Sequence, residues 1–415
     1  MLLSCLLSVL AAVQDDSAAL QHLLDEAVQT GRSRVEIPPG RYRLSEPLWL
    51  RGARDLEISA RGVELVLVDP AKGGLKFTGC RNIRLTGLGL RHETPPFTQG
   101  RIAAIAADER SYDVRLDAGY PELVERPTGY VFEPRSRQIR AGSTDVTASR
   151  VERLGDGLFR LHFPRKSGAS MHAVEVGDRM AFRGQVATDL YIGGSAGITV
   201  EDLTIRNGGG FCIHEDGGEG GNRYKATVTY GPKPAGAEEP PLLSCNADAF
   251  HSSGVRRGPT LDGCLFEGMG DDGVAIHGSY ALLVEAREKS WVVTDGVLRE
   301  GDPLRLITPE GGLAGEARVV SVRGLKDYAP AGKSRFHGFA DLSRFRFAEV
   351  TTEPGLPAGF DWQASNPAAA GSGYVVRHTV IRNHRARGLL LKADDGLVEG
   401  NTIDGSTTAG IVLAP

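Results

Sequence analysis

Hydrophobic and polar positions alternate along this chain in short runs that recur with breaks at Gly, Asn or Asp. The runs occupy residues 83–90, 198–205, 259–266, 374–381 and 396–403. Alternation with a period of two is typical of a strand with one buried face. The last two runs end 403 − 381 = 22 residues apart, which fits one turn of a parallel β-solenoid with repeats of roughly 20–30 residues. The pattern predicts an all-β fold, a right-handed parallel β-helix.

The runs are interrupted twice, at residues 93–187 and 280–372. Both interruptions are rich in β-forming residues, and each carries a similar turn, Val176-Gly-Asp178 in the first and Glu300-Gly-Asp302 in the second. Long structureless loops are uncommon inside a compact domain. The sequence therefore predicts two small β-barrel-like insertions in the coil.

The two ends of the coil differ in sequence. Residues 16–30 have apolar positions at helical spacing, with Asp16 or Ser17 placed to cap the start. A short helix here is expected to cover the first turn and block edge-to-edge strand pairing. Residues 409–415 read as an apolar strand run, and a coil that ended there would leave an open edge. Either the sequence is cut short at Pro415 or an unusual cap covers that edge.

Residues 1–14 are apolar and too short to span a bilayer. They resemble the hydrophobic part of a secretory signal, with cleavage near residues 12–14, although the basic region that usually precedes it is missing. A buried helical turn is the alternative. We expect a secreted or periplasmic protein without a membrane span.

These patterns divide the chain into six expected segments. They are a signal peptide at 1–14, a cap with the first coils at 15–92, a first insertion at 93–187, central coils at 188–279, a second insertion at 280–372 and the last coils at 373–415.

Composition excludes some functions. The 415 residues carry a net charge of −4 with acidic and basic residues mixed throughout, so no nucleic-acid surface is expected. With 54 glycines and 7% aromatic residues, the composition favours turn-rich β structure. Beyond the leader, the cysteines form no CxxC pair and are expected to be buried thiols inside the coil. They are Cys80, Cys212, Cys245 and Cys264. Turn positions are expected at Asn207, Asn383 and Asn401, because Asn tolerates left-handed backbone.

The richest chemistry lies in the central coils. Asp248 precedes the pair Asp271-Asp272 by 271 − 248 = 23 residues, about one turn, and residues one turn apart stack at about 4.8 Å. Glycines flank the pair, so a bulge is expected to turn both carboxylates outward. Two carboxylates about 5 Å apart repel by roughly 3 kcal/mol at an effective dielectric constant near 20. This repulsion is enough to keep one of them protonated, and one protonated and one ionised carboxyl is what glycoside hydrolysis requires.

Other interpretations of the same residues exist. Gly-Asp-Asp-Gly is also a common solvated corner, and it is the second carboxylate one turn away that favours a site. His251 and His277 lie on the same stretch, and a functional and a structural role are equally open for each.

The motifs resemble those of β-helical inverting glycosidases. Asn246-Ala-Asp248 followed by Asp271-Asp272 is similar to the three-aspartate pattern of the polygalacturonases of glycoside hydrolase family 28. The resemblance is closer to the α-1,3-galactosidases of family 110, which also have β-barrel insertions in the helix. It is carried by Asp248-Ala-Phe-His251, Ile276-His277-Gly278 and Asn383-His-Arg385-Ala-Arg387.

This resemblance implies a glycosidase that acts on an oligo- or polysaccharide with inversion, without a metal or other cofactor. It assigns the general acid to Asp271 or Asp272, and gives the other, with Asp248, the attacking water. Substrate contacts are implied for Asn246, His251, His277, Arg223 and Arg387. Two departures are Ala275, where the galactosidases are expected to have Asn, and Leu390-Leu391-Lys392, which matches the polygalacturonase Arg-Ile-Lys triplet poorly.

Two other functions compete. A polysaccharide lyase or epimerase on the same fold would bind Ca²⁺ through the aspartates and use Arg223 or Lys225 as the base. A non-catalytic carbohydrate-binding solenoid is the second, because fold alone does not fix function. The oligomeric state is left open.

Overall fold

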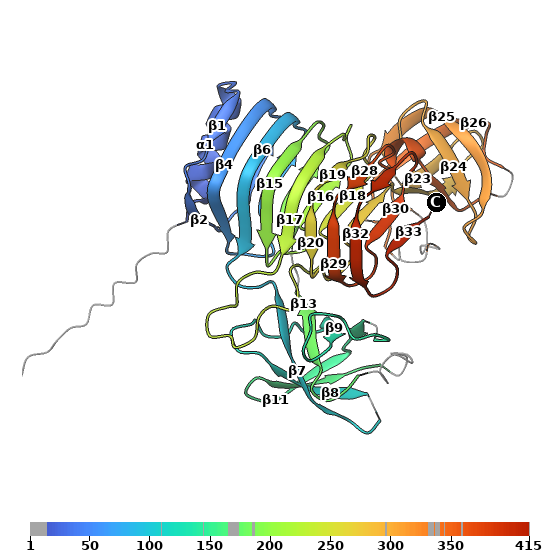
Figure 1. The fold of residues 1–415 in the computed structure, drawn as a ribbon. Helices are drawn as coiled ribbons and strands as arrows, with labels where there is room; N and C mark the ends of the chain where they lie inside the picture. The colour runs from blue at the N-terminus through green and yellow to red at the C-terminus, as the bar shows by residue number, and fades with distance from the viewer. Residues whose placement is uncertain are drawn as a thin grey trace, which may run out of the picture.

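The computed structural model describes residues 15–108, 110–143, 145–164, 174–184, 187–294, 297–330, 336, 341–343, 345–357 and 360–414. The signal peptide expected at 1–14 lies outside these residues. The chain forms a coil of parallel strands from which two further β units project (Figure 1). No helix in the described part of the chain has the length and apolar character needed to cross a membrane.

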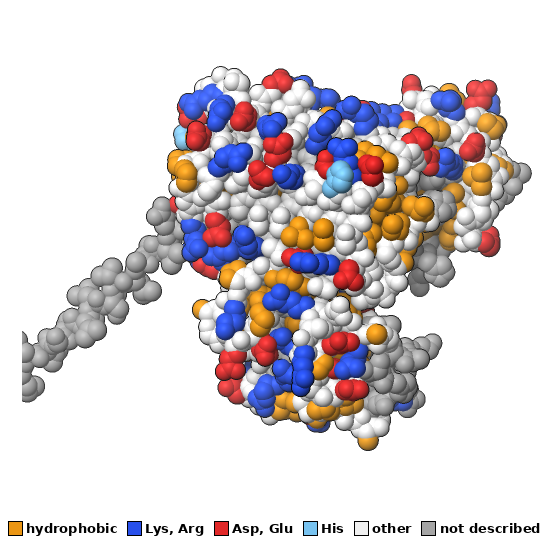
Figure 2. Space-filling view, in the orientation of Figure 1, with side chains coloured by type: hydrophobic (Ala, Val, Ile, Leu, Met, Phe, Trp, Pro, Cys, Tyr) orange, Lys and Arg blue, Asp and Glu red, His pale blue; other side chains and the backbone are white. Residues whose placement is uncertain are grey.

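One parallel sheet, here sheet A, contains all five of the alternating runs. Its strands in the described chain are β1 (Arg34–Glu36), β2 (Gly40–Leu44), β4 (Arg54–Leu67), β6 (Arg81–His92), β15 (Thr199–Arg206), β17 (Arg223–Thr229), β19 (Thr260–Asp262), β20 (Leu265–Glu267), β28 (Val375–Arg377), β29 (Val380–His384), β31 (Leu397–Glu399) and β32 (Thr402–Ser406). Acidic and basic side chains are interspersed over the face of the coil seen in Figure 2, as the sequence predicts.

A second parallel sheet, sheet B, alternates with sheet A along the chain. Its described strands are β3 (Leu48–Arg51), β5 (Leu75–Thr78), β14 (Leu190–Gly193), β16 (Ile213–Asp216), β18 (Phe250–Ser253), β21 (Val274–His277), β30 (Leu389–Lys392) and β33 (Ile411–Leu413). The chain thus passes from sheet A to sheet B and back once per turn.

The register gives the length of a turn. Val200 pairs with Tyr224, an advance of 224 − 200 = 24 residues, and Val376 pairs with Val398, an advance of 398 − 376 = 22 residues. The inward-facing positions of both sheets form one continuous apolar core. The predicted all-β fold of stacked parallel strands is confirmed.

The N-terminal helix is present as α1 (Ser17–Gln29), which buries Leu20, Leu24 and Ala27 against the first turn. Its cap differs from the prediction. Asp16 occupies the N-cap position, but its side chain makes no capping hydrogen bond. Instead, Asp15 Oδ1 accepts from the Ser17 backbone N–H at 3.1 Å.

The two interruptions fold as separate β units. The first, here the inserted sheet, is antiparallel and contains β7 (Phe97–Ile105), β8 (Ser111–Leu116), β9 (Thr128–Phe132), β10 (Val146–Thr147), β11 (Arg150–Gly155), β12 (Leu158–His162) and β13 (Arg179–Arg183). The second, here the inserted barrel, contains β22 (Tyr280–Ala286), β23 (Trp291–Thr294), β24 (Pro303–Ile307), β25 (Leu313–Leu325), β26 (Phe347–Glu353) and β27 (Gln363–Ser365). The barrel is closed as predicted, whereas the described strands of the inserted sheet run in an open order from β10 to β11.

Turn and cysteine predictions are largely met. Asn207 and Asn383 have positive φ angles of 50° and 53°. Asn401 does not; its side chain accepts from the Thr379 N–H and donates to the Val376 carbonyl, which joins two turns. The four cysteines of the described chain are free and buried, as predicted.

Candidate active site

The three aspartates meet at the corner where the chain passes from sheet A to sheet B. Asp248 precedes β18 and Asp272 precedes β21, and the pairing of Phe250 with Val274 places Asp248 opposite Asp272. One carboxylate oxygen from each of Asp248, Asp271 and Asp272 lies within 4.8 Å of the others. The structure therefore brings these three residues together, with an offset of one turn.

Asp272 is held by the next turn of the coil. Arg387 Nε donates to Asp272 Oδ1 at 2.8 Å and Arg387 Nη2 donates to Oδ2 at 2.6 Å. The Arg387 backbone N–H also donates to Oδ1 at 2.8 Å. These hydrogen bonds raise the pKa of Arg387. This two-pronged, charge-assisted contact fixes the Asp272 carboxylate in place, with its side chain 3% exposed.

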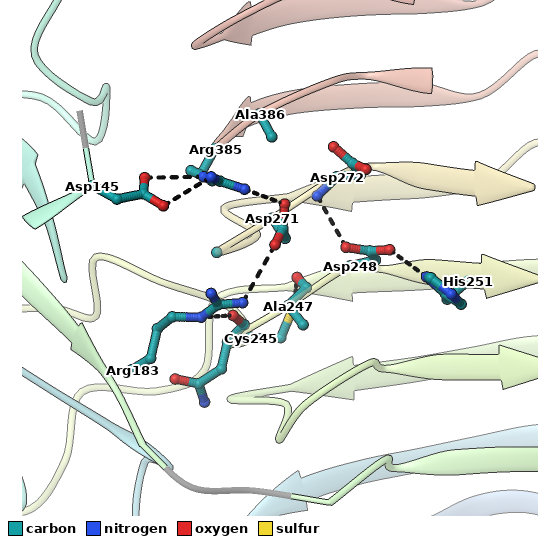
Figure 3. A network of polar contacts seen from close by, with 12 residues as sticks. Asp145, Arg183, Cys245, Ala247, Asp248, His251, Asp271, Asp272, Arg385 and Ala386 are labelled. Carbon is teal, nitrogen blue, oxygen red and sulfur yellow. Dashed lines mark hydrogen bonds and ion pairs between the residues drawn. The ribbon is translucent and has the colours of Figure 1, made fainter. Parts of the chain in front are cut away.

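Asp271 lies between two arginines, Arg385 and Arg183, and both hold its carboxylate (Figure 3). Arg385 Nη1 donates to Asp271 Oδ1 at 2.5 Å, and Arg183 Nη2 lies 3.4 Å from Oδ2. Arg183 comes from β13 of the inserted sheet, and Arg385 also binds both carboxylate oxygens of Asp145. The Asp271 side chain is 23% exposed, which makes it the most accessible carboxylate of the three.

Asp248 lacks such a partner. Within the described chain, no lysine or arginine forms an ion pair with it, and its side chain is 5% exposed. Asp248 Oδ1 accepts from the Asp272 backbone N–H at 3.1 Å, and Oδ2 lies 2.7 Å from His251 Nδ1. Burial raises the pKa of Asp248 well above its usual value, and the charges of Asp271 and Asp272 add to this shift. The site thus contains two arginine-held anions and one carboxyl that favours its protonated form.

Both predicted histidines lie beside Asp248. His251 Nε2 is 3.1 Å from His277 Nε2, and His277 Nδ1 is 2.9 Å from the Gly278 carbonyl. The His251 ring also stacks on Phe211 at 4.2 Å between centroids. Burial lowers the pKa of His251 to about 4, and it also lowers the pKa of His277.

Two predicted substrate contacts are not supported by the geometry. Asn246 is buried; its amide donates to the carbonyls of Pro96 and Gly209 and accepts from the Gly184 N–H. It joins the coil to the inserted sheet, so it has no free group for a sugar. Arg223 begins β17, at the far end of sheet A from the corner with the aspartates, about 20 Å away at the rise of a strand.

Three site residues were missed in the sequence. Arg183 and Tyr130 both come from the inserted sheet, and Tyr130 donates its hydroxyl to the Gly270 carbonyl at 2.7 Å. No periodic pattern predicts a contact made across an insertion. Arg385 lies two residues before Arg387, in the same sequence motif, so this motif could have indicated Arg385 as a site residue.

A small cavity of about 50 Å³ lies beyond His277, between the coil and the inserted barrel. It is lined by Gly278, Tyr280, Arg305, Asn366, Lys392 and Asp394, among others. Lys392 pairs with His277 in the register of β30 and β21. The cavity therefore opens one strand away from the histidines.

A divalent cation fits this acidic cluster poorly. Carboxylate oxygens suit Ca²⁺, but Arg385 and Arg387 already neutralise Asp271 and Asp272. A cation would have to displace these pairs, so the chemistry of the donor set favours acid/base catalysis over metal binding.

Paired anions beside a protonated carboxyl, on a coil of parallel strands, suit acid/base cleavage of a polymer or glycan. No protein-family model matches the chain. The chain is similar to α-1,3-galactosidase B of Akkermansia muciniphila, with 24% identity over 80% of this chain and 42% of that protein. It is also similar to α-1,3-galactosidase A of Bacteroides fragilis strain ATCC 25285, with 22% identity over 64% of this chain and 49% of that protein. The resemblance to this family is thus found in sequence as well, and the chain spans about half the length of these relatives.

Solved structures give weaker similarities. A mannuronan C-5 epimerase A-module of Azotobacter vinelandii is 12% identical over 97% of this chain and 76% of that chain, with a TM-score of 0.33. A surface protein and adhesin of Streptococcus pneumoniae is 10% identical over 97% of this chain and 96% of that chain, with a TM-score of 0.24. At scores this low, neither neighbour bears on function.

Proposed function

We propose that this chain is a glycoside hydrolase unit that cleaves an α-galactoside by acid/base catalysis in a single displacement. One observation carries the proposal. Arginines hold Asp271 and Asp272 as anions, whereas Asp248 is buried without a cation partner. Environments that separate the protonation states of neighbouring carboxyls define an acid and a base.

The same observation assigns the roles. Asp248 donates its proton to the glycosidic oxygen as the bond to the anomeric carbon breaks. Water attacks that carbon and gives a proton to Asp271, the most exposed carboxylate. Asp272 stays an anion and stabilises positive charge on the sugar. These roles differ from those that the sequence resemblance implies, where the acid is Asp271 or Asp272, because both of these carboxylates are paired with arginines and Asp248 is not.

We propose inversion at the anomeric carbon. Inverting pairs are usually about 6.5–9.5 Å apart and retaining pairs about 5–5.5 Å, and the nearest oxygens here lie within 4.8 Å. Separation alone favours retention. The support for inversion is the resemblance to inverting families, together with the arginine contacts, which make Asp271 and Asp272 poor nucleophiles. NMR of the first-formed anomer distinguishes the two outcomes.

Two further features belong to the proposal. A right-handed coil is supported by the strong preference for right-handed crossovers between parallel strands of one sheet. Export from the cytoplasm is supported by the apolar sequence at 1–14.

The test is hydrolysis of α- and β-nitrophenyl galactosides and of α-1,3-linked galactosides by the wild type, Asp271→Asn and Asp272→Asn. We expect release from α-galactosides, with kcat lowered by roughly 100-fold to 10,000-fold in both variants. The matched control is Asp262→Asn, which removes an exposed carboxylate paired with Arg377 on sheet A. An unsaturated product absorbing in the ultraviolet, lost on addition of a chelator, would instead identify a lyase.

A further inference from the structure

We infer that Asp248, His251 and His277 form a proton relay. It holds one proton more than a carboxylate and two neutral imidazoles would, and it keeps this proton on Asp248. This inference rests on the proposed function for its role in turnover. The proton count itself rests on geometry alone.

The count follows from three consecutive contacts. Asp248 Oδ2 lies 2.7 Å from His251 Nδ1, His251 Nε2 lies 3.1 Å from His277 Nε2, and His277 Nδ1 lies 2.9 Å from the Gly278 carbonyl. Each contact is a hydrogen bond only if one hydrogen lies between its two atoms. The carbonyl of Gly278 cannot donate, so His277 Nδ1 carries a hydrogen. Two neutral imidazoles supply only two hydrogens, and three contacts need three.

The third hydrogen can reside in three places without moving a heavy atom. On Asp248, it gives a neutral carboxyl, with His251 protonated at Nε2 and His277 at Nδ1. On His251 or His277, it gives an imidazolium beside a carboxylate. Moving the proton from one end to the other only switches which atom of each pair is the donor, which is the property of a relay.

Surrounding charges hold the proton at the Asp248 end. Asp271 and Asp272 face Asp248 and attract it, while Arg387 beside Asp272 opposes them weakly because it is already paired. At the other end, Lys392 lies opposite His277 and disfavours an imidazolium there. Other titratable neighbours of the relay in the described chain are His214, whose ring packs 5.1 Å from that of His251, and Asp216, which acts on His251 through its charge. The buried thiol of Cys212 lies close enough to interact with the charge of Asp248.

The relay keeps a proton available on the acid. Each turnover takes one proton from Asp248, and a carboxyl that is 5% exposed exchanges slowly with water while substrate covers the site. His251 and His277 keep the proton on Asp248 until the glycosidic oxygen takes it. After the product leaves, Asp248 takes up a proton from water, and the proton accepted by Asp271 returns to solvent. His251 and His277 are thus positioning residues for the acid.

The first test needs no substrate. ¹⁵N NMR of the intact chain labelled at histidine reports which ring nitrogens carry hydrogen. We expect His251 to be protonated at Nε2 and His277 at Nδ1 near neutral pH, and Asp248→Asn to keep this pattern, because an amide N–H donates to His251 Nδ1 as the carboxyl does. A His277 protonated only at Nε2, or rings that interconvert freely between tautomers, would overturn the relay whether or not the chain is a glycosidase.

The second test separates a relay from a structural role. His277→Ala is expected to lower kcat by about tenfold or more while KM stays within twofold, to move the basic limb of the kcat profile to lower pH, and to recover on addition of imidazole. His378→Ala, which removes an exposed histidine on sheet A, is the control and should match the wild type. A loss of activity with an unchanged pH profile and no recovery would contradict the relay while leaving the proposed hydrolysis intact.

Discussion

The inserted sheet and the inserted barrel have the same length and the same type of turn, but they contact different parts of the molecule. Each lengthens one turn by the same amount: Leu85 pairs with Val200 and Leu261 with Val376, so 200 − 85 = 115 and 376 − 261 = 115 residues. Each also contains a Gly-Asp turn. Asp178 Oδ2 accepts from the Glu175 N–H at 2.9 Å in one unit, and Asp302 makes the corresponding bond in the other.

The arginine that binds each of these aspartates differs. Asp178 pairs with Arg140 of the inserted sheet itself, which ties the unit together. Asp302 accepts from Nη1 and Nη2 of Arg256, which belongs to the coil, at 2.7 Å and 2.9 Å. The same turn therefore stabilises one unit internally and docks the other onto the solenoid.

Position on the coil explains which unit reaches the site. The inserted sheet enters between β6 of sheet A and β14 of sheet B, at the same type of corner as the aspartates. The inserted barrel enters between β21 of sheet B and β28 of sheet A, at the opposite corner. Hence Arg183 contacts Asp271, whereas the barrel lines the cavity beyond His277. An insertion in a solenoid acts on the corner from which it emerges.

The largest expected effect comes from removing the cations at Asp271. Arg385→Met should lower kcat/KM by about 100-fold to 1,000-fold, because the anion loses its 2.5 Å partner. Arg183→Met should cost less, about tenfold, since its contact is longer. Arg101→Met, which removes an exposed arginine of the same inserted sheet, is the matched control. If all three variants lost activity equally, the contacts of Arg385 and Arg183 with Asp271 would have no special role in catalysis.

A smaller effect, on stability alone, is expected for the inserted barrel. Arg256→Met leaves Asp302 largely buried without its cation and should lower the free energy of unfolding by about 3 kcal/mol, measured by urea denaturation. Its kcat should stay within twofold of the wild type. Arg287→Met, in an exposed pair with Glu285 of the same barrel, should change stability by at most about 1 kcal/mol. If Arg256→Met reduced kcat as strongly as Arg385→Met, the two units would not differ in function.

The smallest effect is expected in the coil itself, outside both inserted units. Glu215 is buried and accepts from Ser252, Asn222 and Tyr224. Burial raises its pKa, so the folded chain binds more protons than the unfolded chain, and stability is lost as pH rises above about 4.5. Glu215→Gln should flatten this decline above about pH 4.5 without changing kcat. If the stability of Glu215→Gln fell with pH as steeply as that of the wild type, other groups would be responsible for the decline.

The repeat made much of this site predictable. A turn of about 23 residues was enough to place Asp248 beside Asp271-Asp272, because stacking depends only on the number of residues per turn. Asn246 lies in the same motif, yet it bonds to backbone groups near Pro96 and Gly184 that no local pattern specifies. Arg183 is 88 residues from Asp271 and reaches it only through the fold of the inserted sheet. Arg223 shares the alternation of sheet A but lies at its other end, and composition does not distinguish the two corners.

The most direct test of the account compares leaving groups. A variant that lacks the acid should fail on a disaccharide, whose leaving oxygen needs a proton, yet still cleave a dinitrophenyl galactoside, whose leaving group does not. Asp248→Asn should therefore lose about 1,000-fold on an α-1,3-galactoside and little on the dinitrophenyl substrate, whereas Asp271→Asn should lose activity on both. The reverse pattern, with Asp248→Asn impaired on both substrates and Asp271→Asn only on the disaccharide, would contradict the assignment of the proton to Asp248.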